Sequence, residues 1–142
     1  MSGFLLDTNV LSEFNRRGAP DPLVKKWLEL VDPGSLYASV LTFAEIRFGV
    51  ELLPQGRRRT QLEEWLDRDL LEWFGDRVLP VDRATADRWG VLRAQAQMKG
   101  RPLSVVDGLL AATALQNGLS MVSRNVSDFA GLELNVVNPW ET

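Results

Sequence analysis

Five short apolar runs alternate along the chain with longer segments in which apolar residues recur every three or four positions. The runs predict strands over residues 4–6, 36–40, 78–81, 119–123 and 134–137. The periodic segments predict helices over residues 22–31, 42–53, 57–74, 82–100 and 104–118, with another short helix directly after the first strand. Strands separated by helices need crossover connections, so the pattern predicts an α/β fold with a mostly parallel sheet covered by helices.

Length and composition fit one globular domain. The chain has 142 residues, of which 45% are hydrophobic and 25% charged, and single domains commonly run to roughly 100–200 residues. We therefore expect residues 1–142 to form a single domain. No apolar run approaches the ~20 residues that a membrane helix needs, and the first residues lack the basic start of a signal peptide. These features predict a cytoplasmic protein with no membrane partner.

The charge and the missing residue types narrow the possible chemistry. With 16 Lys and Arg against 19 Asp and Glu, the net charge is -3, so a nucleic acid would have to be bound locally and not by the overall field. The chain has no cysteine and no histidine. Thiol nucleophiles, serine–histidine triads and zinc or haem sites with these ligands are therefore excluded. The remaining hard oxygen ligands point to Mg²⁺ or Mn²⁺ if a metal is bound.

Acidic and amide residues follow the predicted strands or begin the helices after them. Asp7 ends the first strand, Glu45 and Asp107 fall in the first turn of predicted helices, and Asn125 and Asp128 follow the strand at 119–123. Ligands of open parallel sheets bind beyond the carboxyl ends of the strands. If these strands are neighbours, the carboxylates converge and repel one another, and a divalent cation would relieve that repulsion.

Each acid also has a purely structural interpretation. Thr42-x-x-Glu45 is a capping box and Ser104-x-x-Asp107 resembles one, so both acids could serve only to satisfy helix N–H groups. Asp7 could be a turn residue and Asp128 an ordinary loop acid. The metal hypothesis therefore depends on the conjunction of the acids and not on any one of them.

Five blocks along the chain together resemble the PIN domain, and in particular the VapC-type ribonuclease toxins of the FitB-like branch. They are LLDTNVLSE at 5–13, SVLTFAEIRFG at 39–49, SVVDGLLAATA at 104–114, SRN and DF at 123–129, and VNPW at 137–140. The resemblance implies an α/β/α sandwich with a parallel sheet. It also implies RNA cleavage with Mg²⁺ or Mn²⁺ and an antitoxin protein as partner.

The resemblance assigns metal coordination to Asp7 and Asp107, with Glu45 as a third acid. The fourth acid of the family often falls where this chain has Asn125, an amide that can still ligate through its oxygen. Asp128, three residues later, is a candidate to supply the missing charge.

The residues around these acids supply candidates for substrate binding and assembly. Thr8 and Asn9 lie beside Asp7, and Arg101 and Arg124 lie close in sequence to the acid-bearing turns, so we expect these four to hold RNA. An apolar stripe on the helix predicted over 57–74 could form the surface for a homodimer or for the antitoxin.

Three other classes of protein remain as comparisons. A receiver-type signalling domain needs a pair of acidic residues near its start and a lysine near its final strand. This chain has neither, because Asp7 is the only acidic residue among residues 1–12 and no lysine follows Lys99. A non-catalytic binding module, whose acids are only helix caps, would show no divalent-ion site in a metal titration. Another carboxylate–metal nuclease or phosphatase would be distinguished by substrate screening.

Overall fold

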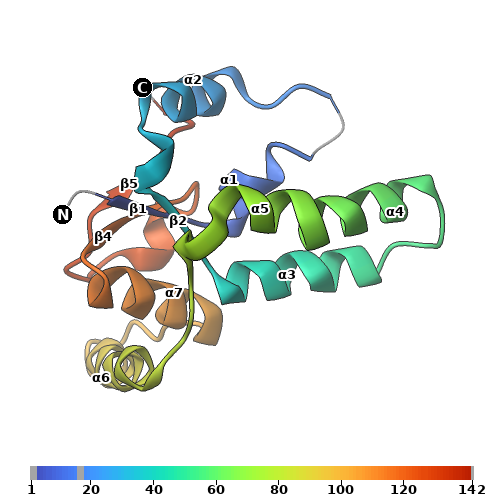
Figure 1. Ribbon diagram of the computed structural model, residues 1–142. Coiled ribbons are helices and arrows are strands. Elements are labelled where there is room, and N and C mark those ends of the chain that lie inside the picture. The colour runs from blue at the N-terminus through green and yellow to red at the C-terminus, as the bar shows by residue number, and fades with distance from the viewer. Residues whose placement is uncertain (1–2, 16–17, 142) are drawn as a thin grey trace.

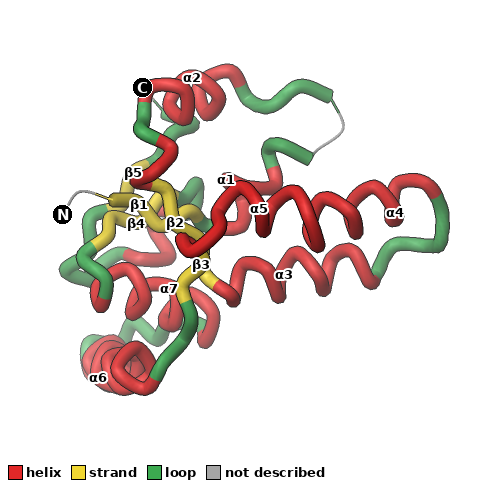
Figure 2. Tube along the Cα trace, in the orientation of Figure 1, coloured by secondary structure: helices red, strands yellow, loops and turns green. Residues whose placement is uncertain are grey.

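The computed structural model describes residues 3–15 and 18–141. Its centre is a five-stranded sheet in the order β3-β2-β1-β4-β5, shown in Figure 2. The strands are β1 (Gly3–Leu6), β2 (Leu36–Ser39), β3 (Val78–Leu79), β4 (Leu119–Val122) and β5 (Val136–Val137). Every neighbouring pair is parallel, which confirms the predicted sheet. All carboxyl ends of the strands therefore lie along one edge.

Helices cover both faces of this sheet (Figure 1). They are α1 (Thr8–Ser12), α2 (Pro22–Leu30), α3 (Val40–Glu51), α4 (Arg57–Glu64), α5 (Leu70–Phe74), α6 (Arg83–Met98) and α7 (Val105–Gln116). Leu6 on β1 packs in a core with residues of α1, α2 and α5, whereas its neighbour Leu5 packs in a second core with residues of α6 and α7. Successive strand residues face opposite sides of a sheet, so two cores follow from one strand. The expected α/β/α sandwich is confirmed.

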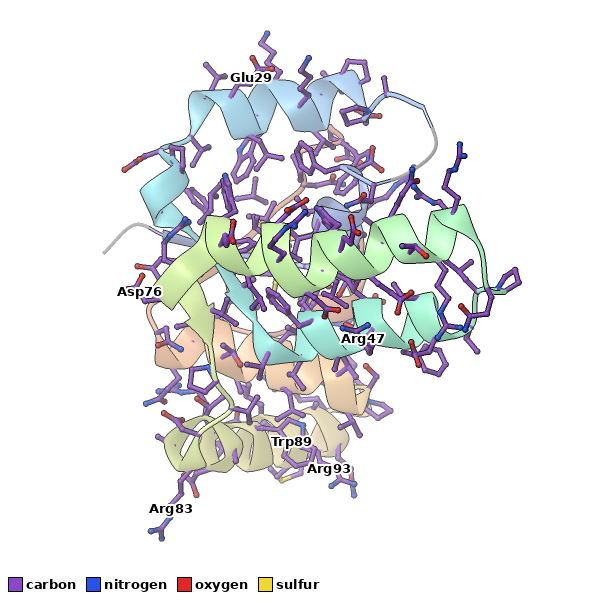
Figure 3. The ribbon with its side chains drawn as sticks, turned by 45° about the vertical axis from the view of Figure 1, so that its right-hand side comes forward. Glu29, Arg47, Asp76, Arg83, Trp89 and Arg93 are labelled. Atoms are coloured by element: carbon purple, nitrogen blue, oxygen red, sulfur yellow. The ribbon has the colours of Figure 1, made fainter. Side chains whose placement is uncertain are left out.

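Helices α3 and α4 form an arm that extends away from the sheet in Figure 1. Arg47 of α3, labelled in Figure 3, forms an ion pair with Asp67, and Arg59 pairs with Glu51 at 3.0 Å. The pairs lie near the surface, where each contributes at most about 1 kcal/mol, so they orient the arm more than they stabilise it.

Several predicted boundaries were wrong by a few residues. Helix α3 begins at Val40 and not at Thr42, because the Ser39 side chain caps it by accepting from the Leu41 N–H at 3.0 Å. The helix predicted over 57–74 contains a π-helical turn at Trp65–Asp69 between α4 and α5. Strand β3 stops before Pro80, which has no N–H for the sheet. Within the described ranges, no helix is long and apolar enough to cross a membrane.

Candidate active site

Strands β1 and β4 place Asp7 and Ser123 side by side at the carboxyl edge of the sheet. Leu6 pairs with Val122 in the parallel register, and the Asp7 N–H donates to the Val122 carbonyl at 2.9 Å. Asp7 is only 7% exposed, and its Oδ1 accepts from the Thr8 N–H at 2.7 Å, which caps α1. The carboxylate therefore has a fixed position where the central strands end.

Ser123 organises this part of the site. Its fully buried hydroxyl donates to Asp7 Oδ2 at 2.8 Å, and the same Oγ accepts from the Asn125 N–H at 3.0 Å. Asn9 Nδ2 lies 3.4 Å from this oxygen, and Asn9 Oδ1 accepts from the Arg124 N–H at 3.3 Å. The candidate list from the sequence omits Ser123. The parallel register of the first and fourth strands would have revealed it, because it places Ser123 opposite Asp7.

Glu45 is held toward Asp7 by a hydroxyl of α1. Thr8 Oγ1 donates to Glu45 Oε1 at 2.9 Å. The capping-box interpretation of Thr42 and Glu45 was wrong: because α3 begins at Val40, Glu45 is its sixth residue and lies beyond the free N–H groups of the first turn. The Glu45 carboxylate therefore contacts Thr8 in the site and does not cap the end of α3.

Asp107 enters the site from the first turn of α7. The cap of this helix is Ser104, whose Oγ accepts from the Asp107 N–H at 3.2 Å, as half of a capping box would have it. A cavity of about 340 Å³ lies beside it, lined by residues including Asp107, Asp128 and Arg101. The Asp107 carboxylate therefore borders an open space that a ligand can enter.

Burial and neighbouring carboxylates raise the pKa values of Asp7 and Glu45. Burial raises the pKa of Asp7, and the charges of Asp107 and Asp128 raise it further, while the hydrogen bonds from Ser123 and Thr8 lower it. Burial also raises the pKa of Glu45, with the Asp7 and Asp107 charges acting in the same direction and the Thr8 bond opposing them. Asp7, which follows β1, is thus close enough to Asp107 and Asp128 for their charges to act on it, and Glu45 of α3 is close enough to Asp7 and Asp107.

The model of the PIN domain family matches residues 4–131. The chain belongs to the PIN-domain family. Toxin FitB of Neisseria gonorrhoeae is 38% identical over 136 residues, covering 96% of this chain and 97% of that protein. A VapC ribonuclease of Sinorhizobium fredii is 38% identical over 137 residues, covering 96% and 97%. The plasmid stability protein StbB of Pseudomonas syringae is 39% identical over 137 residues, covering 96% and 98%.

The solved structure of FitAcB from Neisseria gonorrhoeae superposes on this PIN domain with a TM-score of 0.91. It is 37% identical in sequence and covers 98% of this chain and 99% of that one. The family resemblance and the fold expected from the sequence are therefore both confirmed. Nucleases of the VapC type in this family generally depend on a divalent metal.

The donors in this PIN domain fit a hydrated divalent cation. In residues 3–15 and 18–141, no three acids are close enough to form a complete metal site on their own. Mg²⁺, however, usually keeps several waters and takes only one or two carboxylates from a protein. Asp7 and Asp107 offer hard oxygen ligands whose mutual repulsion such an ion would remove.

The remaining predicted residues, Arg101, Arg124, Asn125 and Asp128, are all exposed. Asn125 is exposed two residues after Ser123, and Asp128 lies in the short helical turn Val126–Phe129 that follows. Arg124 is exposed, with its guanidinium 5.5 Å from the centre of the Trp140 ring. Arg101 borders the acidic cavity. Roles for these side chains in ligand binding stay predictions.

Proposed function

We propose that this protein is a metal-dependent endoribonuclease and the toxin of a toxin–antitoxin pair, with residues 1–142 acting as one nuclease domain. The observation that carries the proposal is the convergence of Asp7, Glu45 and Asp107 at the carboxyl edge of the sheet, in a chain without histidine or cysteine. Relatives of the PIN domain are named VapC ribonuclease and, in Shigella flexneri, tRNA(fMet)-specific endonuclease.

Asp7 and Asp107 would hold the cation, Mg²⁺ or Mn²⁺, because both present hard oxygen donors at the site. When bound, such an ion supplies a nucleophilic water at neutral pH and neutralises charge on the phosphoryl group. Ser123 and the Thr8 N–H stabilise the ionised form of Asp7, in which it can act as a ligand. Asn125 and Asp128 are the proposed contributors at the fourth acidic position.

Glu45 is the proposed proton acceptor or water-orienting group. Its raised pKa brings its basicity closer to that required near neutral pH, and Thr8 fixes the direction of its carboxylate. Thr8 orients Glu45 through its hydroxyl, and Asn9 accepts from the Arg124 N–H. Both residues would also face the substrate.

RNA is the proposed substrate, and it requires local cations because the chain is acidic overall. Arg101 borders the carboxylate cavity and Arg124 is exposed beside Asn125, so both could contact phosphates. A ribonuclease toxin acts where RNA is, which places the proposed action in the cytoplasm.

An antitoxin protein is the proposed partner. A solved toxin–antitoxin complex from Klebsiella pneumoniae is 28% identical to this chain with a TM-score of 0.71. We also propose a homodimer, for which exposed apolar residues such as Phe48, Leu52 and Trp73 offer surface.

The proposal is tested by cleavage of a panel of RNAs, single-stranded DNA and a phosphomonoester by purified protein. Cleavage should occur with RNA, require added Mg²⁺ or Mn²⁺, stop with EDTA and be lost in Asp7→Asn and Asp107→Asn. Asp87→Asn, which removes an exposed acid of α6, serves as the matched control. Undiminished RNA cleavage by chelator-treated protein, or by Asp7→Asn, would refute the mechanism, and a preference for the phosphomonoester would refute the substrate.

A further inference from the structure

A second cavity, of about 420 Å³, adjoins the acidic one. It lies between α6, the segment 99–103, the end of α7 and the segment 130–133, and the two cavities share the lining residues Arg101, Leu103 and Ala130. Its size falls within the roughly 300–1,000 Å³ of small-ligand sites. A molecule that enters the acidic cavity can therefore extend past Arg101 into the second one.

The second cavity has an excess of cationic groups. Arg88, Lys99 and Arg101 line it against one acid, Glu133. Arg88 is engaged, because its Nε donates to Gln116 Oε1 at 2.9 Å. Within the part of the chain that the structure describes, neither Lys99 nor Arg101 forms an ion pair, although Arg101 shares a cavity with Asp107 and Asp128. Two cations are thus available to an anionic ligand.

Gly131 makes room for the Arg101 guanidinium at the junction of the cavities. A Cβ at this position would lie 3.1 Å from Arg101 Nη1, closer than side-chain carbons normally approach. The φ angle of Gly131 is +85°, which also favours glycine. The guanidinium therefore lies against the bare backbone of Gly131.

The wall of the second cavity is apolar. Val91 and Leu92 of α6 face it, together with Leu103, Leu115 and Leu132. Cationic and apolar lining residues side by side match the two parts of a nucleotide, its phosphate and the flat face of its base.

Resting on the proposed ribonuclease function, we propose that the second cavity binds one unpaired nucleotide of the RNA, adjacent to the phosphate that is cut. Lys99 and Arg101 each contact one of the two phosphates that flank it in the strand, and its base packs against Val91 and Leu132. A base that is stacked and paired in a duplex cannot enter a cavity, so the bound nucleotide must be unpaired.

The phosphate contacts are tested by binding in the absence of cleavage. The probe is a labelled single-stranded RNA that the wild-type protein cuts, titrated with Asp7→Asn protein at increasing salt. Each phosphate contact to a single strand contributes about 0.7 to the slope of log Kd against log salt. Lys99→Gln should lower the slope by about 0.7, and the double variant with Arg101→Gln by about 1.4.

Arg83→Gln is the matched control for this experiment. Arg83 lies at the opposite end of α6 from Lys99 and points away from the molecule in Figure 3. Its variant should keep the slope of the Asp7→Asn parent. Equal slopes for all variants would overturn the proposed subsite, whereas failure of the wild-type protein to cut any RNA would overturn the proposed function itself.

The base contact is tested with RNAs lacking the base on either side of the cut phosphate. For the wild-type protein, one of the two changes should raise KM by at least about fivefold with little change in kcat, as expected for loss of one packed base. Val91→Trp, which fills the cavity from an exposed position, should raise KM for intact RNA similarly and remove the sensitivity to the missing base.

Ala94→Trp adds the same side chain elsewhere on α6, outside the cavity lining, and should behave as wild type. The same cut site placed within an RNA duplex should not be cleaved. An unchanged KM for both base-free RNAs, or equal cleavage of the duplex, would overturn the assignment of an unpaired nucleotide to this cavity.

Discussion

Replacing Ser123 by alanine tests whether the active site depends on the buried hydroxyl that holds Asp7. The change removes a 2.8 Å hydrogen bond to a carboxylate that is 7% exposed, and it leaves the Asn125 N–H without its acceptor. Hydrogen bonds to charged groups contribute about 1.5–3 kcal/mol, and neutral ones about 0.5–1.5 kcal/mol. Ser123→Ala should therefore lower the free energy of unfolding by about 2–3 kcal/mol at neutral pH without metal.

The contribution of the charge can be isolated with a double-mutant cycle. In an Asp7→Asn background the partner of Ser123 is neutral, so the same substitution should cost about 1 kcal/mol less. Urea denaturation of the wild type, both single variants and the double variant measures this coupling. Ser120→Ala is the matched control, since Ser120 lies on β4, directly before the Ser123 segment, but its hydroxyl accepts from the Asn135 side-chain amide.

Metal binding provides a second readout that a merely structural serine would not change. The Ser123 bond lowers the pKa of Asp7, so its loss raises that pKa further, and protons then compete better with the cation. The pH midpoint of Mn²⁺ binding should move upward in Ser123→Ala and stay in place in Ser120→Ala. A coupling energy near zero together with an unmoved midpoint would refute the role assigned to Ser123.

Three further predictions concern the acids and the helix that carries Asp107. The pKa of Asp7 is raised in the folded state, so its ionised form destabilises the metal-free fold at a pH above that pKa. Asp7→Asn should therefore raise the melting temperature at pH 7. This gain should vanish as the pH falls toward about 3.9, the pKa of an aspartate in the unfolded chain. Calorimetric titration should show that Asn125→Asp binds Mn²⁺ more tightly than the wild type. Asp128→Ala should weaken Mn²⁺ binding less in the Asn125→Asp background than in the wild type. If the two effects are additive, Asp128 is an ordinary loop acid. Gly108→Ala should lower the free energy of unfolding, measured by urea denaturation, by about 1–3 kcal/mol, because the added Cβ would lie 2.7 Å from Trp89 Nε1. This loss should be smaller in a Trp89→Phe background. Equal losses in both backgrounds would exclude the clash.

The sequence pattern predicted the sheet because buried parallel strands and the helices between them have different periods. All five predicted runs contain a strand, although the two edge strands β3 and β5 are two residues long. Their shortness could not be predicted from apolar pattern alone, since an edge strand ends where its single neighbour stops offering hydrogen bonds. Pro80 marks this limit for β3, and nothing comparable in sequence marks it for β5.

The acids of the site were predictable from their position after strands, while the groups that orient them were not. The charges of Asp107 and Asp128 act on Asp7, and those of Asp7 and Asp107 act on Glu45, which fits parallel strands that end together. Thr8 was expected to hold substrate, and its hydroxyl in fact donates to Glu45. Such a partner depends on where α1 and α3 meet, a contact between residues 37 positions apart that no local pattern encodes.

The absence of histidine gives these hydroxyl groups a particular importance. A carboxylate as buried as Asp7 tends to take up a proton, and in many sites a charged imidazole would oppose this. Here the Ser123 hydroxyl and the Thr8 N–H oppose it with neutral dipoles, and they do so before any cation arrives. Because neutral dipoles offset burial only in part, the pKa of Asp7 stays raised and the metal-free site keeps an unfavourable concentration of negative charge. A divalent cation bound here would relieve this repulsion. Because a ligand that binds only the folded state stabilises that state by mass action, the same cation would also stabilise the fold. The same surplus of negative charge favours cationic ligands at the cavity that Asp107 and Asp128 line.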